Sequence, residues 1–170
     1  MLSGEGRMEP AELIVNAWLQ MQGYFVMPNI RVDEAGKKGK KSELDILAIK
    51  LKQNEKEVES KLHVEVTVSV HPFGRWNKKY LEKILKKFNE ERRERWVEKY
   101  IGDGYKRLLV MSDKCLPRDL KKFENTLKKN GINYKCFSEI VKDLKEMLKG
   151  KSYDDFTRRF LTLIFEHEDI

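Results

Sequence analysis

The stretch KLHVEVTVSV, residues 61–70, alternates apolar and polar side chains more regularly than any other part of the chain. Leucine and valine occupy its even positions, whereas His63, Glu65 and Thr67 stand among the odd ones. A period of two residues is that of a β-strand with one apolar face. Pro72 and Gly74 follow and end the strand. Glu65 therefore stands on the polar face of a predicted strand.

A helix and two strands are predicted before this stretch. The helix runs from Glu9 to about Gln22, because Pro10 suits a first helical position, apolar residues then recur at helical spacing, and Gly23 follows. Extended apolar runs at residues 24–32 and 43–51 are the strands, and charged turns separate them from each other and from the stretch at 61–70. Short turns join antiparallel neighbours, so these three strands form a meander.

The second half of the chain alternates helices and strands. One long helix is predicted from about Asn77 to Tyr100, with Leu81, Ile84 and Phe88 on its apolar side. Further strands are expected at 106–111 and 132–137, and further helices at 117–129, 138–148 and 153–166. Strands joined through a helix usually pair parallel. The fold class is therefore α/β, with a mixed sheet and helices on both faces.

Length and composition limit the classes of protein. The chain has 170 residues and a net charge of +7, and 40% of its residues are hydrophobic. We expect a tail at 1–9, one domain at 10–150, and a C-terminal helix at 151–170 that packs on the domain or forms a dimer. No apolar run is long enough for a membrane span, and no secretion signal is recognised. The two cysteines are too few for a zinc site or a disulfide framework, so a cytoplasmic protein is expected. The basic charge points to an anionic partner such as nucleic acid.

Two carboxylates stand in neighbouring predicted strands. Asp45 interrupts an apolar run, where a charge is costly unless it is paired or bound to a cation. If Lys50 and Lys61 flank the turn, Asp45 falls opposite Val66, and a shift of one residue places it opposite Glu65. Two carboxylates at such a short distance repel each other unless a cation such as Mg²⁺ lies between them. The alternative is a polar face on which both acids pair with lysines.

The order of these elements, with Glu12 in the first helix, ELDILA at 43–48 and LHVEVT at 62–67, resembles the PD-(D/E)XK nuclease superfamily. This superfamily is also called restriction-endonuclease-like, and the chain is most similar to its archaeal Holliday-junction-resolvase and Mrr-like branches. The resemblance covers about residues 10–137. It implies a three-layer sandwich with an αβββαβαβ core, here with extra C-terminal helices.

The resemblance also implies a reaction and its residues. Asp45 matches the motif aspartate, Glu65 matches the acidic residue of the triplet, and Glu12 resembles the acidic residue of the first helix. In such enzymes these side chains bind Mg²⁺ (or Mn²⁺), which activates water for attack on a phosphodiester. The expected function is therefore a metal-dependent DNA endonuclease with Asp45, Glu65 and Glu12 as metal ligands.

The triplet departs from the family pattern, because Thr67 stands where lysine is expected. Threonine can orient water, but it has no charge with which to stabilise the transition state. Lys78 or Lys79, at the start of the following helix, is a candidate replacement, and we place Lys78 among the catalytic residues. His63 and His71 share the face of Glu65 as candidate proton relays, the alternative being surface residues on a polar strand.

Cationic side chains gather in two segments that are expected to bind nucleic acid. One is a glycine-rich turn and the other joins a strand to the long helix, where Trp76 is positioned to stack on a base. These residues are Lys37, Lys38, Lys40, Lys41, Arg75, Trp76, Lys78 and Lys79. Further cations, including Lys87, Arg92, Arg93 and Arg95, continue along the helix, where the alternative is a solvated face that glutamates neutralise.

Three functions stay open at this point. The first is a Mg²⁺-dependent endonuclease acting on DNA, on branched DNA or on RNA. The second is a catalytically inactive nucleic-acid-binding module on the same fold. The third is a structural subunit that docks through the terminal helix, whose many apolar residues also fit a homodimer. No membrane partner is expected.

Overall fold

A computed structural model describes residues 9–32, 42–53, 56–68, 78–113, 120–150 and 156–166. Within these residues the protein is an α/β structure of five strands and six helices. In chain order the elements are α1 (Pro10–Met21), β1 (Phe25–Val32), β2 (Ser42–Leu51), β3 (Val58–Thr67), α2 (Lys78–Asn89), α3 (Glu91–Ile101), β4 (Lys106–Met111), α4 (Leu120–Lys129), β5 (Ile132–Cys136), α5 (Phe137–Leu148) and α6 (Phe156–Glu166).

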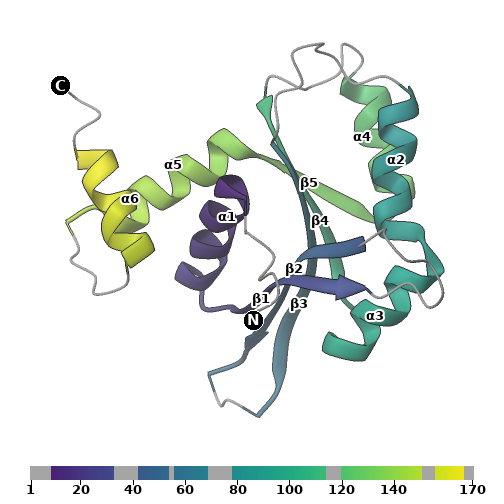
Figure 1. Ribbon diagram of the computed structural model, residues 1–170, viewed down its shortest axis with the longest axis horizontal. Helices are drawn as coiled ribbons and strands as arrows, with labels where there is room; N and C mark the ends of the chain where they lie inside the picture. Colours follow the sequence, from purple (N-terminus) through teal and green to yellow (C-terminus); the bar gives the residue numbers. More distant parts are fainter. Residues whose placement is uncertain are drawn as a thin grey trace, which may run out of the picture.

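The strands form one mixed sheet in the order β1-β2-β3-β4-β5 (Figure 1). β1, β2 and β3 pair antiparallel, whereas β3, β4 and β5 pair parallel through helical connections. Both features confirm the prediction. In the β2–β3 ladder Ile46 pairs with Val64 and Leu47 with His63, so continuing the ladder by one residue places Asp45 opposite Glu65. Of the two registers that the sequence allows, the structure has the one that brings the carboxylates together.

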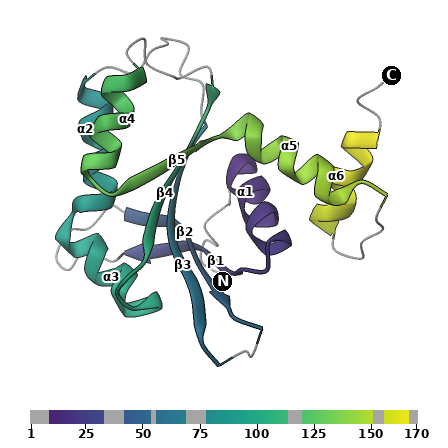
Figure 2. The same cartoon turned by 180° about the vertical axis from the view of Figure 1, so that it is seen from behind.

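Helices cover both faces of the sheet. α1, α5 and α6 lie on one face, and α2, α3 and α4 lie on the other (Figures 1 and 2). The first face holds one large apolar core, to which β3 contributes Leu62 and Val64. Two smaller cores lie on the second face, one under α2 and α4 and one under α3. The molecule is thus a three-layer α/β structure.

Two polar residues on the odd-numbered face of β3 are buried, although the sequence pattern predicts contact with solvent. His63 is 1% exposed and Glu65 is 0% exposed. His63 lies against the Phe88 ring of α2 and the Tyr105 ring, with ring centroids 5.0 and 6.2 Å apart. The alternation correctly divides the strand into two faces, but α2 and α3 cover the polar one. The interpretation of His63 as a surface residue is therefore wrong.

The single long helix predicted from Asn77 to Tyr100 is also wrong. α2 ends at Asn89 and α3 begins at Glu91, with Glu90 between them in an extended conformation, φ −73° and ψ 113°. The apolar stripe of α2 stops at Phe88, and no apolar residue follows until Trp96. The break lets the two helices follow different parts of the sheet, α2 over β4 and α3 over β1 and β2.

The last helix, α6, packs on α5 and α1. Leu161 and Phe165 belong to the core on that face, whereas Phe160 is 52% exposed. Residues 153–155 of the predicted helix lie outside the described residues. Among the helices that the structure describes, none combines the length and apolarity that crossing a membrane requires.

Candidate functional site

Asp45 of β2 and Glu65 of β3 meet at the ammonium group of Lys87, which comes from α2. Lys87 Nζ lies 3.2 Å from Asp45 Oδ2 and 2.7 Å from Glu65 Oε2. Two carboxylate oxygens from adjacent strands therefore face one cation. The spacing is that of hydrogen-bonded ion pairs. The convergence of Asp45 and Glu65 on one face of the sheet, predicted from the strand register, is present.

The geometry of α2 explains how Lys87 reaches the strands. Tyr80, Ile84 and Phe88 pack toward the sheet, and Lys87 stands three residues after Ile84, at the edge of the same face. At the start of the helix the Tyr80 hydroxyl lies 2.8 Å from Thr67 Oγ1, so α2 runs back along the end of β3. The stem of Lys87 crosses the apolar layer, and its ammonium group ends at the carboxylates.

Glu65 is held by three groups. Its Oε1 accepts hydrogen bonds from His63 Nε2 at 2.9 Å and from Arg93 Nη2 at 2.5 Å, while Oε2 faces Lys87. Burial alone raises the pKa of Glu65, but the His63 hydrogen bond and the positive charges of Lys87 and Arg93 outweigh it and lower the pKa to about 2. Glu65 is therefore ionised throughout the physiological pH range.

Arg93 ties the lysine and the glutamate together. This residue is 4% exposed and lies on the buried side of α3. Besides its bond to Glu65, it donates from Nε to the backbone carbonyl of Lys87 at 2.7 Å. One guanidinium thus fixes the last turn of α2 and the carboxylate of β3 in the same arrangement. We assign Arg93 a positioning role, because its fork of donors matches these two acceptors.

Asp45 is the site's more accessible acid, with 12% of its side chain exposed. Its Oδ2 accepts a hydrogen bond from the backbone N–H of Val66 at 2.8 Å. Burial and the nearby negative charge of Glu65 raise the pKa of Asp45 to about 7, since Lys87 and the Val66 N–H offset them only in part. Burial disfavours the charged form of Lys87, but the negative charges of Glu65 and Asp45 outweigh this effect and raise the pKa of Lys87. Lys87 therefore stays protonated.

Glu12 does not join this cluster. It lies in the first turn of α1, where its carboxylate accepts a hydrogen bond from the Glu9 N–H at 3.3 Å as part of a capping box. Burial raises the pKa of Glu12, and the charge of Lys87 lowers it, so the two groups interact at a distance. Within the described ranges no three His, Cys, Asp or Glu residues are grouped to hold a metal ion. Asp45 and Glu65 are the acids that meet at Lys87, and the role of Glu12 as a third acidic ligand stays a prediction.

The other predicted residues have different positions. The Thr67 hydroxyl is hydrogen-bonded to the Tyr80 hydroxyl, and Lys79 is exposed on α2. Lys78 begins α2, nine residues or about 13 Å along the helix from Lys87, and its side chain is not described. Outside the described residues lie Lys37, Lys38, Lys40, Lys41, His71, Arg75 and Trp76. Among the lysine side chains that the structure describes, Lys87 is the one that reaches the carboxylates.

Two cations of the site, Lys87 and Arg93, are missed by the sequence reasoning, which places them on a basic surface. Lys87 is seven residues from Tyr80 and three from Ile84, and Arg93 is four residues before the buried Val97. Both stand at positions where helical periodicity requires an apolar residue. A charged residue inside an apolar stripe is the signal that identifies them, because such a charge needs a buried partner.

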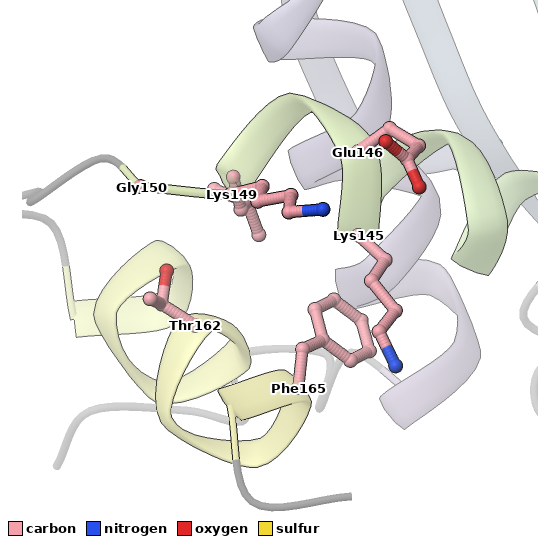
Figure 3. Close-up of a pocket in the computed structure, with 7 residues that line it drawn as sticks. Lys145, Glu146, Lys149, Gly150, Thr162 and Phe165 are labelled. Carbon is pink, nitrogen blue, oxygen red and sulfur yellow. The ribbon is translucent and has the colours of Figure 1, made fainter. Parts of the chain in front are cut away.

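Two surface hollows are lined by residues other than Asp45, Glu65 and Lys87. One, of about 320 Å³, is lined on α3 by Arg92, Arg95, Trp96 and Lys99. The other, of about 230 Å³, lies between α5 and α6, where the Phe165 ring and Thr162 face Lys145 and Lys149 (Figure 3). This second hollow is on the far face of the sheet from α2 (Figure 1), so it contributes nothing to the site.

The arrangement combines two acids, one of which, Asp45, has its pKa raised to about 7, with a lysine whose side chain is 33% exposed. Such a set has the chemistry to hold a cation or to approach a phosphate. Comparisons of this chain with protein-family models, with curated proteins and with solved structures found no match.

Proposed function

We propose that the protein is a Mg²⁺-dependent endonuclease of the restriction-endonuclease-like fold that hydrolyses phosphodiester bonds in DNA. The observation that carries the proposal is the position of Lys87 Nζ, within 3.2 Å of both Asp45 and Glu65. The triplet lacks its lysine because Thr67 stands in that place. An ammonium group beside both carboxylates restores the missing charge from the neighbouring helix.

The residues present fit a divalent cation. Asp45 and Glu65 offer hard oxygen donors, which Mg²⁺ and Mn²⁺ prefer, and both already face a single cationic group. Asp45 and Glu65 would hold the metal, while Arg93 and His63 stay bound to Glu65 Oε1. A bound Mg²⁺ would polarise a phosphate oxygen and lower the pKa of a water molecule.

The protein side chains have separate roles in this proposal. Asp45 and Glu65 hold the cation, and Arg93 and His63 keep the Glu65 carboxylate ionised and oriented. Lys87, with a third of its side chain exposed, turns from the carboxylates toward the phosphate and stabilises the negative charge that develops there. Glu12 acts through its charge alone.

A plasmid-nicking assay tests the assignment of Lys87. The wild-type protein is expected to nick supercoiled DNA with Mg²⁺ or Mn²⁺ and to stop when EDTA is added. Lys87→Gln should lower the nicking rate by roughly a hundredfold, because it removes one charged donor to the transition state. The matched control is Lys86→Gln, which removes the same charge from the exposed neighbouring position on α2. Equal rates for the two variants would contradict a catalytic role of Lys87.

Metal affinity is expected to depend on pH through Asp45. Because its pKa is raised to about 7, Asp45 is mostly protonated at pH 6 and mostly ionised at pH 8, and a metal must displace the proton at the lower pH. The apparent affinity for Mn²⁺ should therefore be about tenfold weaker at pH 6 than at pH 8. Calorimetric titration at both values measures this ratio, and a ratio near one contradicts the role of Asp45.

A second candidate function is nucleic-acid binding without catalysis. It is favoured by the contacts of Glu65, whose two oxygens already meet three donors. If these pairs are permanent, the cluster is a buried ion-pair network and the fold serves as a binding module. This candidate predicts salt-sensitive binding to DNA with no metal-dependent nicking, so the plasmid assay separates the two functions.

A further inference from the structure

One face of α3 carries a row of cations around an indole ring. Arg92, Arg95, Trp96 and Lys99 follow the spacing i, i+3, i+4, i+7, which places them on one side of a helix. They line the hollow of about 320 Å³. We call these four residues the α3 stripe. No step of the proposed reaction uses them.

The acidic residues of α3 lie on another side of the helix. Glu91, Glu94 and Glu98 share a face, and Glu94 is bound to Arg107 of β4. Glu91 reaches Arg95 only at 3.8 Å, with both side chains largely exposed, so this pair contributes little. Among the described residues that line the hollow, none is acidic. The glutamates of α3 thus stand on a different side of the helix from the residues that line the hollow.

Aromatic rings give the stripe a flat surface. Trp96 stacks on Tyr100, with ring centroids 6.0 Å apart and planes 22° apart, and Lys99 Nζ lies 4.5 Å from the centre of the Trp96 ring. Trp96 also packs on the apolar core under α3, which fixes its position. Tyr100 is 44% exposed. Cations beside fixed and accessible aromatic rings are the pattern by which proteins bind single-stranded nucleic acid.

The stripe begins beside the candidate site. Arg92 precedes Arg93, whose guanidinium binds Glu65, so the first cation of the stripe is the sequence neighbour of a residue of the site. From Arg92 to Lys99 the helix rises about 10 Å, a length that spans several nucleotides of a stacked strand.

We propose that the α3 stripe binds an unpaired segment of the nucleic-acid substrate, with phosphates on its cations and a base against Trp96 and Tyr100. The link to cleavage rests on the function proposed above, whereas the binding does not require it. A duplex also presents phosphates to the cations, but its bases are stacked on each other and offer no free face to the rings. The substrate is therefore expected to contain a single-stranded end, flap or branch.

The cationic part is tested by fluorescence anisotropy with a labelled dT oligonucleotide in EDTA, where no cleavage occurs. The double variant Arg95→Gln/Lys99→Gln should bind roughly tenfold more weakly, and the slope of log affinity against log salt should fall by about 1.4, for two lost phosphate contacts. The control is Lys142→Gln/Lys149→Gln, which removes two exposed charges around α5 on the far face of the sheet. Equal weakening by both double variants overturns the proposal.

The aromatic part is tested with Tyr100→Ala, an exposed position whose truncation spares the core. It should weaken binding of the dT oligonucleotide roughly tenfold and leave binding of a duplex of equal length unchanged. Equal losses for both probes overturn the assignment to an unpaired strand. Absence of salt-sensitive binding by the wild type also overturns it and indicates a protein partner for this face. Strand binding without metal-dependent nicking supports the stripe and contradicts the nuclease.

Discussion

The Asp45→Asn variant is expected to lose Mg²⁺-dependent nicking by at least about a thousandfold, since a neutral amide is a poor ligand for a hard divalent cation. Its binding to DNA in EDTA should change by less than about twofold, because Asp45 is a metal ligand rather than a phosphate contact. Plasmid nicking and anisotropy measure the two quantities. The matched control is Asp103→Asn, the same replacement at an exposed turn after α3.

The same variant should be folded at least as stably as the wild type at pH 8. The folded protein raises the pKa of Asp45 from 3.8 to about 7, so the ionised carboxylate costs stability at every pH above the lower value. Asparagine removes that cost and can still accept the hydrogen bond from the Val66 N–H. Thermal unfolding at pH 8 checks this. Loss of nicking together with a lower unfolding midpoint would show that Asp45 supports the fold instead of the reaction.

Arg93→Met is expected to lower the free energy of unfolding by about 3–5 kcal/mol, the cost of breaking a buried ion pair by removing one partner. Glu65 Oε1 loses one of its two donors, and the Lys87 carbonyl loses the Arg93 Nε–H. Denaturant unfolding measures the change. Arg95→Met makes the same replacement at a position with 69% of its side chain exposed, and should cost less than about 0.5 kcal/mol.

A double-mutant cycle separates the loss of the ion pair from the loss of the packing that Arg93 makes. The double variant Glu65→Gln/Arg93→Met removes both members of the pair, so it should be less destabilised than the two single variants taken together, with a coupling of about 1–3 kcal/mol. Additive losses in this cycle would contradict a direct role of the pair. A loss below about 1 kcal/mol for Arg93→Met alone would do the same.

Much of the fold could be predicted because its signals are local. The alternation in β3 assigns His63 and Glu65 to one face from the strand period alone, and short turns fix the antiparallel meander. The length of the turn before β3 left two registers open for Asp45. Hydrogen bonding across the sheet, which depends on both strands at once, selects the register that pairs it with Glu65.

The rest of the site depends on packing between distant elements. The alternation in β3 shows a polar face, but only the position of α2 and α3 shows that this face is buried. The lysine that lies beside both carboxylates stands 22 positions after Glu65 along the chain, on a helix whose rotation its apolar stripe determines. A short distance along the chain from Glu65 favours Lys78 and Lys79 in the prediction, whereas the rotation of α2 places Lys87 beside Glu65.

The break at Glu90 places one cation of Glu65 on each of two helices, with a guanidinium spanning the gap between them. The angle between α2 and α3 and the positions of the charges around the Glu65 carboxylate are therefore coupled. A change of this angle would move Lys87 relative to Arg93 and so change the charges around Glu65.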